Sequence, residues 1–230
     1  MTQATAPSRH SNWFLIVAAL FVTCLVVSNI IAVKVIDIAG FILPAAIIIF
    51  PVSYILGDVL TEVYGYARAR QVIWLGFLCN LVAVVAIAIS GVLPEAGFWG
   101  GQAAYETILG TVPRILAASF IAYLVGELVN AYVLARLKVA MQGRHLWVRT
   151  IGSTLVGQLL DSAIFITVAF AGVMPGEVLA GAVITQWLVK SAYEALATPL
   201  TYAAVGFLKR VDNVDVYDRD LHFRPFSVSE

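Results

Sequence analysis

Residues 71–91 read QVIWLGFLCNLVAVVAIAISG, a run of 21 residues without a single charged side chain. A helix of about 20 apolar residues is long enough to cross the hydrocarbon core of a bilayer. Five further apolar runs reach that length, at 13–36, 43–65, 114–137, 149–172 and 180–208. Membrane barrel strands instead show alternating apolar residues over about ten positions. The sequence therefore predicts an all-α integral membrane protein with six transmembrane helices.

Composition supports the same class. The chain is 61% hydrophobic and 12% charged, with a mean hydropathy of +0.91, so it has too little charge to cover the surface of a soluble domain. Residues 13–208 are expected to form one transmembrane domain, and no room remains for a soluble one. Residues 1–12 are expected to be a disordered N-terminus, and residues 209–230 a C-terminal tail.

The basic residues predict the orientation. Of the 14 lysines and arginines, 11 lie before the first run, between runs two and three, around the connection from run four to run five, or after run six. Basic residues concentrate in the cytoplasmic loops of membrane proteins. Both termini are therefore expected in the cytoplasm, in a multi-pass protein of the cell inner membrane.

Polar residues inside the runs predict a site. A charged side chain at the bilayer centre costs roughly 3 kcal/mol on insertion scales, so such residues usually face a bundle interior and serve a function. Helical spacing places Asp58 with Glu62, and Lys190 with Glu194, on shared faces. We expect a polar cavity lined by Asn29, Asp58, Glu62, Glu127, Asn130, Gln158, Asp161, Lys190 and Glu194. Its aromatic walls are expected from Tyr54, Tyr123, Phe165, Trp187 and Tyr193.

Structural roles for some of these residues stay open at this point. Glu62 could form an ion pair with Arg68 or Arg70, and Lys190 could pair with Glu194 on its own helix. Buried amides such as Asn29 also join helices without binding a ligand.

Four prolines carry predictions about helix ends. Pro44 and Pro113 fit the first turn of the second and fourth spans, where a missing amide hydrogen costs nothing. Pro51 and Pro199 lie inside apolar runs, where proline tends to kink a helix.

Enzymatic activity is not expected. His10, His145 and His222 all fall outside the apolar runs, which argues against an intramembrane serine protease, and the tyrosine companion pattern of aspartyl proteolysis is missing. The sequence has no phosphate-binding loop. Neither cofactor nor metal is expected, since no cysteine–histidine spacing suits a metal. A transporter is the leading interpretation; the alternative is a substrate-binding membrane subunit that depends on a separate ATPase.

Six short motifs follow one another along nearly the whole chain. They are Ser28-Asn29 with Lys34, Gly57-Asp58 through Glu62-Val-Tyr-Gly65, Gly126-Glu127 with Asn130, Arg149-Thr-Ile-Gly-Ser153 with Gln158 and Asp161, Tyr193-Glu194 before Thr198-Pro199-Leu200, and Asp215-Val-Tyr-Asp218. In this order they resemble the queuosine precursor transporter family, also called the vitamin uptake transporter family.

The resemblance implies import of cyano- and aminomethyl-deazaguanine bases for tRNA modification. It also implies six helices in a layout similar to the substrate-binding subunits of energy-coupling-factor vitamin transporters. The expected partners are the deazaguanine substrate and membrane lipid, without nucleic acid, and homodimer formation is left open. Because an ionised carboxylate can accept two adjacent donors, Glu127 or Glu194 is expected to bind the guanine-like edge of the base. The other buried acids are candidates for proton-linked gating.

Overall fold

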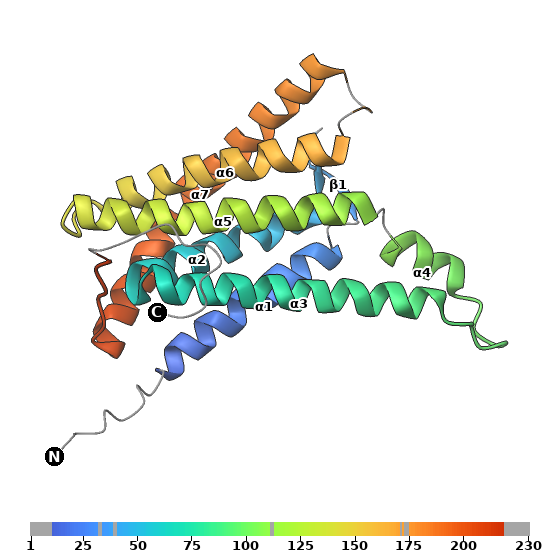
Figure 1. Ribbon diagram of the computed structural model, residues 1–230, viewed down its shortest axis with the longest axis horizontal. Helices are drawn as coiled ribbons and strands as arrows, with labels where there is room; N and C mark the ends of the chain where they lie inside the picture. The colour runs from blue at the N-terminus through green and yellow to red at the C-terminus, as the bar shows by residue number, and fades with distance from the viewer. Residues whose placement is uncertain are drawn as a thin grey trace.

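The computed structural model describes residues 11–31, 34–38, 41–110, 113–170, 172 and 175–218. Within these ranges, α-helices form a bundle together with one short hairpin and a 3-10 turn (Figure 1). The helices are α1 (Asn12–Ile31), α2 (Phe50–Tyr64), α3 (Tyr66–Val92), α4 (Gln102–Leu109), α5 (Pro113–Ala140), α6 (Leu146–Phe170) and α7 (Gly176–Asp212). The strands are β1 (Val35–Ile38) and β2 (Phe41–Pro44), and Ala45–Ile48 forms the 3-10 turn.

Among the residues that the structure describes, four helices are long and apolar enough to cross a membrane. They are Asn12–Ile31, Tyr66–Val92, Ala117–Ala140 and Leu146–Val168. α2 has 15 residues and is therefore about 22 Å long, shorter than a hydrocarbon core of about 30 Å. α7 has 37 residues and ample length, but Lys190 and Glu194 interrupt its apolar sequence. The chain is thus a multi-pass helical membrane protein, and the six-span count stays a prediction.

The start of the second predicted span was wrong. Residues 43–65 were expected to be helical throughout, but β1 and β2 pair antiparallel, with Val35 opposite Pro44 and Ile38 opposite Phe41. Pro44 ends β2, a position where its missing amide hydrogen is tolerated. Pro51, expected to kink the helix, instead lies in the first turn of α2.

The other helix boundaries lie close to the predicted runs. Gly65 has a φ of 87°, which is outside helical geometry, so α2 ends at Tyr64 and α3 begins five residues before the run that starts at residue 71. Pro113 is the first residue of α5, and Pro199 lies within α7, both as predicted. The expected disorder of residues 1–12 concerns positions 1–10, which lie outside the described residues; Asn12 already belongs to α1.

Two glycines bring α5 and α6 into close contact. A Cβ atom on Gly157 would lie 2.8 Å from the carbonyl oxygen of Gly126 and 2.8 Å from the Cβ of Asn130. A Cβ on Gly126 would lie 2.8 Å from the Cβ of Asp161. Small residues allow close helix approach in membranes, where apolar burial alone drives helices together only weakly. This crossing places Asn130 against Gly157 and Asp161 against Gly126.

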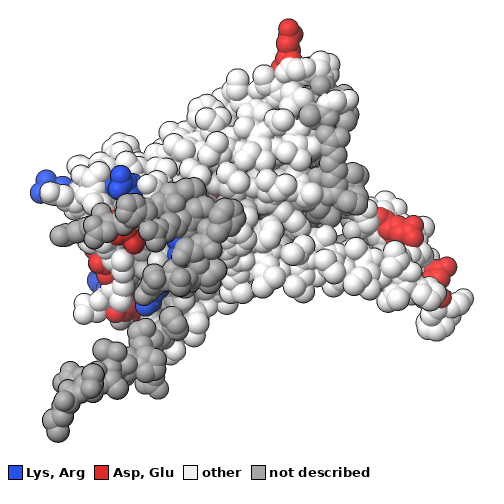
Figure 2. Space-filling model, in the orientation of Figure 1, with Lys and Arg blue, Asp and Glu red and all other residues white. Residues whose placement is uncertain are grey.

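Charged side chains visible in one view gather at the two ends of the bundle (Figure 2). Lysines and arginines lie at the end that also holds the C-terminal part of α7, which we call the basic end. Acidic side chains also lie at the opposite end (Figure 2). Glu95 after α3, Glu106 on α4 and Glu177 at the start of α7 are exposed. Between the ends, α3 exposes large apolar side chains, as expected for a surface in contact with lipid.

Replacing Gly157 with alanine tests the α5–α6 crossing. Because the added methyl group would press on backbone and Cβ atoms, we expect Gly157→Ala to destabilise the bundle by about 1–3 kcal/mol. Gly206→Ala on α7 is the matched control, since nothing lies within 4 Å of a Cβ there. Where no contact is disturbed, replacing glycine with alanine inside a helix stabilises the protein by about 0.5–1 kcal/mol. Thermal unfolding in detergent measures both variants, and equal melting temperatures would contradict the close crossing.

Candidate functional site

Four buried carboxyl groups from four different helices gather in the interior, and we call them the acid cluster. Asp58 on α2 and Glu127 on α5 are 0% exposed, Glu194 on α7 is 2% exposed and Asp161 on α6 is 4% exposed. Asp58, Glu194 and Asp161 all lie within electrostatic range of Glu127. The structure therefore brings together four acids that the sequence distributes over 137 positions, from 58 to 194.

One asparagine and one glycine position two of these acids. Asn130 donates a hydrogen bond from Nδ2 to Asp58 Oδ1 at 2.7 Å, which joins α5 to α2. The carboxyl group of Glu127 lies directly against Gly57, where any added Cβ would overlap its Oε1 atom. Gly57 thus leaves the space that the Glu127 carboxyl group occupies.

Lys190 forms an ion pair with Asp161 of the neighbouring helix. Its ammonium also lies 5.0 Å from the centre of the Phe50 ring, a distance suited to a cation–π contact. The alternative in which Lys190 pairs with Glu194 on its own helix was therefore wrong. Asp161 is the acid of the cluster that has a cationic partner among the described residues.

Aromatic rings border the acid cluster. Tyr54 and Tyr123 are buried and meet edge to face, with their ring centres 6.3 Å apart. Phe50 packs on Tyr54 at 5.2 Å, and Phe21 lies 6.4 Å from Tyr123. Phe50 was not predicted, although its spacing of four and eight residues from Tyr54 and Asp58 puts all three on one helical face.

The other predicted aromatic residues have different surroundings. Trp187 donates its indole N–H to the Leu155 carbonyl oxygen at 2.9 Å and so connects α7 to α6. Tyr193 is 36% exposed and is not part of the buried cluster. Phe165 is half-buried on α6.

Several buried oxygen atoms of this region have no hydrogen-bond partner among the described residues. The carboxylate and amide acceptors are Asp58 Oδ2, both Oε atoms of Glu127, Asn130 Oδ1, Gln158 Oε1 and Glu194 Oε1. The hydroxyl groups of Tyr54, Tyr123, Thr154 and Ser162 share this property. Buried polar atoms in proteins are nearly always hydrogen-bonded. So many open acceptors in one interior region mark it as a candidate ligand site.

Asn29 lies outside the acid cluster. Its Nδ2 donates to Asn80 Oδ1 at 2.8 Å, and Ser119 Oγ donates to Asn29 Oδ1 at 3.5 Å, so it connects α1, α3 and α5. Asn29 and Asn80 also line a mostly apolar cavity of about 520 Å³ between these helices and α4. The contacts of Asn29 therefore show a residue that joins helices, which is the structural role that the sequence left open.

Glu62 is the centre of an ion cluster at the basic end. Its carboxylate forms ion pairs with Arg149, with Lys209 at 2.7 Å and with Lys138 at 3.7 Å. Neither Arg68 nor Arg70, the partners considered from the sequence, forms a described ion pair with it. We call Glu62, Lys138, Arg149 and Lys209 the basic-end cluster.

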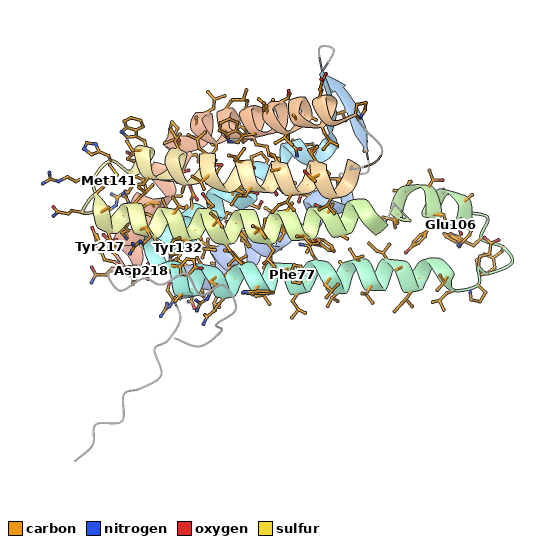
Figure 3. The ribbon with its side chains drawn as sticks, turned by 45° about the horizontal axis from the view of Figure 1, so that its top comes forward. Phe77, Glu106, Tyr132, Met141, Tyr217 and Asp218 are labelled. Atoms are coloured by element: carbon orange, nitrogen blue, oxygen red, sulfur yellow. The ribbon has the colours of Figure 1, made fainter. Side chains whose placement is uncertain are left out.

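Residues 213–218, the tail segment, cover this cluster. Asp215 pairs with Lys138 and, at 3.0 Å, with Lys209. The Val216 N–H donates to the Val63 carbonyl oxygen at 3.3 Å, and Asp218 Oδ2 accepts the Tyr66 N–H at 3.0 Å. In Figure 3, Tyr217 and Asp218 lie at the end of the bundle opposite Glu106. The tail segment thereby joins α2, α3, α5 and α7.

The fold and the acid cluster define a helical membrane protein with a polar interior, the arrangement in which transporters bind their substrates. The sequence profile described as "Putative vitamin uptake transporter" matches residues 44–204, and the chain belongs to this family. It is 34% identical over 182 residues to the "Probable queuosine precursor transporter" of Bacillus subtilis, covering 78% of this chain and 79% of the relative.

A second relative is the "Queuosine precursor transporter" of Escherichia coli, which is 32% identical over 124 residues, covering 53% of this chain and 52% of the relative. A third, the "Probable queuosine precursor transporter" of Haemophilus influenzae, is 31% identical over 121 residues, covering 53% of this chain and 49% of the relative. No solved structure matches the chain.

Docking of the tail segment is expected to depend on pH through Asp215. Burial by itself would raise the pKa of Asp215, but hydrogen bonds and ion pairs with Lys138 and Lys209 outweigh burial and lower this pKa. The carboxylate therefore stabilises the docked tail above the ordinary aspartate pKa of about 3.9. This stabilisation is lost as the pH falls through the lowered value.

Hydrogen exchange of residues 213–218 measures this docking. At neutral pH, the tail segment of Asp215→Asn should exchange faster than that of the unaltered chain. Asp212→Asn is the control: Asp212 accepts the Tyr64 hydroxyl at 2.5 Å and forms no described contact with the tail segment, so this variant should leave Val216 protected. Unchanged exchange in Asp215→Asn would contradict the role of this carboxylate.

Proposed function

We propose that this chain imports queuosine precursors, the cyano- and aminomethyl-deazaguanine bases used in tRNA modification, across the inner membrane. The observation that carries the proposal is the acid cluster with its open acceptors, in a chain whose relatives are named queuosine precursor transporters. A deazaguanine ring presents a ring N–H beside an exocyclic amino group. These two donors suit one ionised carboxylate, and adenine lacks the same pattern.

Glu127 is the preferred partner for that edge. Both of its oxygens are buried and have no hydrogen-bond partner among the described residues, whereas Glu194 has one such oxygen. The hydroxyl groups of Tyr54 and Tyr123 lie within electrostatic range of Glu127, and the rings of these residues are proposed to pack on the base. All of these groups come from one chain, so the proposal requires no second copy.

The basic-end cluster is proposed as the inner gate. Glu62 is one helical turn from Asp58 on α2, so the route from the acid cluster to the basic end runs past it. A base could leave on that side only after Glu62 separates from at least one of Arg149, Lys138 and Lys209, which come from three other segments of the bundle. The proposal assigns the chain no catalytic step.

The proposed topology has six spans, with α2 and α7 joining the four helices that are long and apolar enough alone. The basic end faces the cytoplasm because basic residues are retained there. Both termini are then cytoplasmic, in a layout similar to the substrate-binding subunits of energy-coupling-factor transporters.

Reconstitution of the purified chain alone in liposomes tests transport. We expect uptake of radiolabelled aminomethyl-deazaguanine without any ATPase, and competition by unlabelled base but not by adenine. Binding without uptake would instead support the alternative of a subunit that needs a separate ATPase. Absence of both binding and uptake would contradict the proposed function.

Two substitutions test recognition by Glu127. Glu127→Gln keeps the shape but removes the ionised double acceptor, and a hydrogen bond to a charged group contributes about 1.5–3 kcal/mol. We therefore expect deazaguanine affinity to fall by about 10- to 150-fold. Gly57→Ala should also weaken binding, because the added methyl group displaces the Glu127 carboxyl group.

Calorimetric titration of folded protein measures these affinities. Glu106→Gln is the matched control, since this acid is exposed and lies on α4, a helix that contributes no residue to the acid cluster. Unchanged affinity in both Glu127→Gln and Gly57→Ala would place the recognition site elsewhere.

Single cysteines at positions 100 and 142 test the orientation. Gly100 lies in the connection between α3 and α4, and Gln142 lies between α5 and α6 at the basic end. After replacement of Cys24 and Cys79, a membrane-impermeant maleimide added to intact cells should label position 100 alone. Labelling of position 142 and not of position 100 would reverse the proposed topology.

A further inference from the structure

The acid cluster has more negative groups than cationic partners. Lys190 forms an ion pair with Asp161, and no other ion pair to the cluster is present among the described residues. Within that part of the chain, Asp58, Glu127 and Glu194 are therefore buried without a cation beside them. Because an isolated buried carboxylate is strongly disfavoured, each such group is expected to take up a proton, to accept hydrogen bonds from a ligand or to meet a positively charged one.

Two of these acids interact electrostatically with each other. Asp58 is within electrostatic range of Glu194, and both are within range of Glu127. Each of Asp58 and Glu194 has one oxygen atom without a hydrogen-bond partner in the described part of the chain. A positive charge between them would be attracted to both carboxylates at once, and the attraction is strong away from water.

An organic cation fits this pair better than a metal ion. In the described residues, no three carboxyl, imidazole or thiol groups are close enough together to hold a metal. The open atoms around the pair are acceptors, including Asn130 Oδ1 and Gln158 Oε1. An ammonium group carries three N–H donors and no acceptor, so it complements this set of atoms.

The two precursor classes differ in this property. An aminomethyl substituent is an alkylamine and is protonated at neutral pH, like lysine. A cyano substituent is uncharged and has only an acceptor nitrogen, which would face the oxygens of Asp58 and Glu194 without a donor. The ring edge is the same in both bases.

We infer that the acid cluster prefers the base with a protonated amine over its neutral cyano counterpart, and that Asp58 and Glu194 bind the ammonium while Glu127 binds the ring edge. This inference rests on the proposed function and specifies the substrate of that site. Asp161 is excluded from the role because Lys190 already occupies its carboxylate.

Calorimetric titration of the full chain in lipid nanodiscs at neutral pH compares the two bases. In the unaltered protein we expect the aminomethyl base to bind at least tenfold more tightly than the cyano base. Asp58→Asn and Glu194→Gln should each reduce this ratio toward one, because each weakens binding of the aminomethyl base more than binding of the cyano base. Glu127→Gln should weaken both bases and keep the ratio.

The outcomes separate the inference from the function on which it rests. If neither base binds the unaltered chain, the proposed function fails. If both bind equally, or if the ratio survives in Glu194→Gln, the function stands and the preference for a cation is overturned. Thermal unfolding shows whether each variant is folded. If Asp58→Asn loses its hydrogen bond with Asn130 and unfolds, the result for Glu194→Gln alone tests the preference for a cation. Glu106→Gln again serves as the control.

Discussion

A carboxylate inside a membrane-spanning bundle is tolerated only where other groups compensate its charge, and this constraint organises the whole interior. Glu62 satisfies it with three cations from α5, α6 and α7. Asp161 satisfies it with Lys190, and Asp58 is partly satisfied by the amide of Asn130. Glu127 and Glu194 lack cationic partners among the described residues. The candidate site is therefore the region in which the protein does not itself neutralise the charge of its buried carboxylates.

Close helix packing makes this distribution of charge achievable. Gly126 and Gly157 let the α5 and α6 backbones approach, and Gly57 makes room for the Glu127 carboxyl group. Larger residues at these positions would separate the helices and let lipid or water reach the acids. The glycines therefore affect the polarity of the interior indirectly, because they set how closely the helices pack around the acids.

The sequence predicted the bundle better than it predicted the contacts within it. Runs of apolar residues located α1, α3, α5, α6 and α7, because length and hydropathy depend only on local composition. The same criterion failed at residues 43–44, where the predicted second span begins inside β2, since a short apolar run suits a strand as well as a helix. Acids were correctly expected to be buried, because a charged residue in a membrane-spanning run almost always faces the interior of the bundle.

Partners across helices could not be predicted from spacing. Periodicity suggested Glu194 for Lys190, whereas the observed partner, Asp161, lies 29 positions away on another helix. Tyr193 was expected beside Glu194, but consecutive helical residues point about 100° apart, so burying Glu194 turns Tyr193 outward. Predicting the Lys190–Asp161 pair and the exposure of Tyr193 requires the arrangement of the helices in space. A single sequence does not contain that arrangement.

The tail segment also has a consequence for biosynthesis. Lys138 is almost fully buried, and its contacts with Asp215 and with the Val216 carbonyl oxygen span 77 and 78 positions of sequence. A ribosome completes α5 long before it adds these residues. The basic end therefore reaches its final arrangement only after residues 215 and 216 have emerged. Until then the Lys138 ammonium keeps its contacts with Glu62 but lacks the two acceptors that the tail segment supplies.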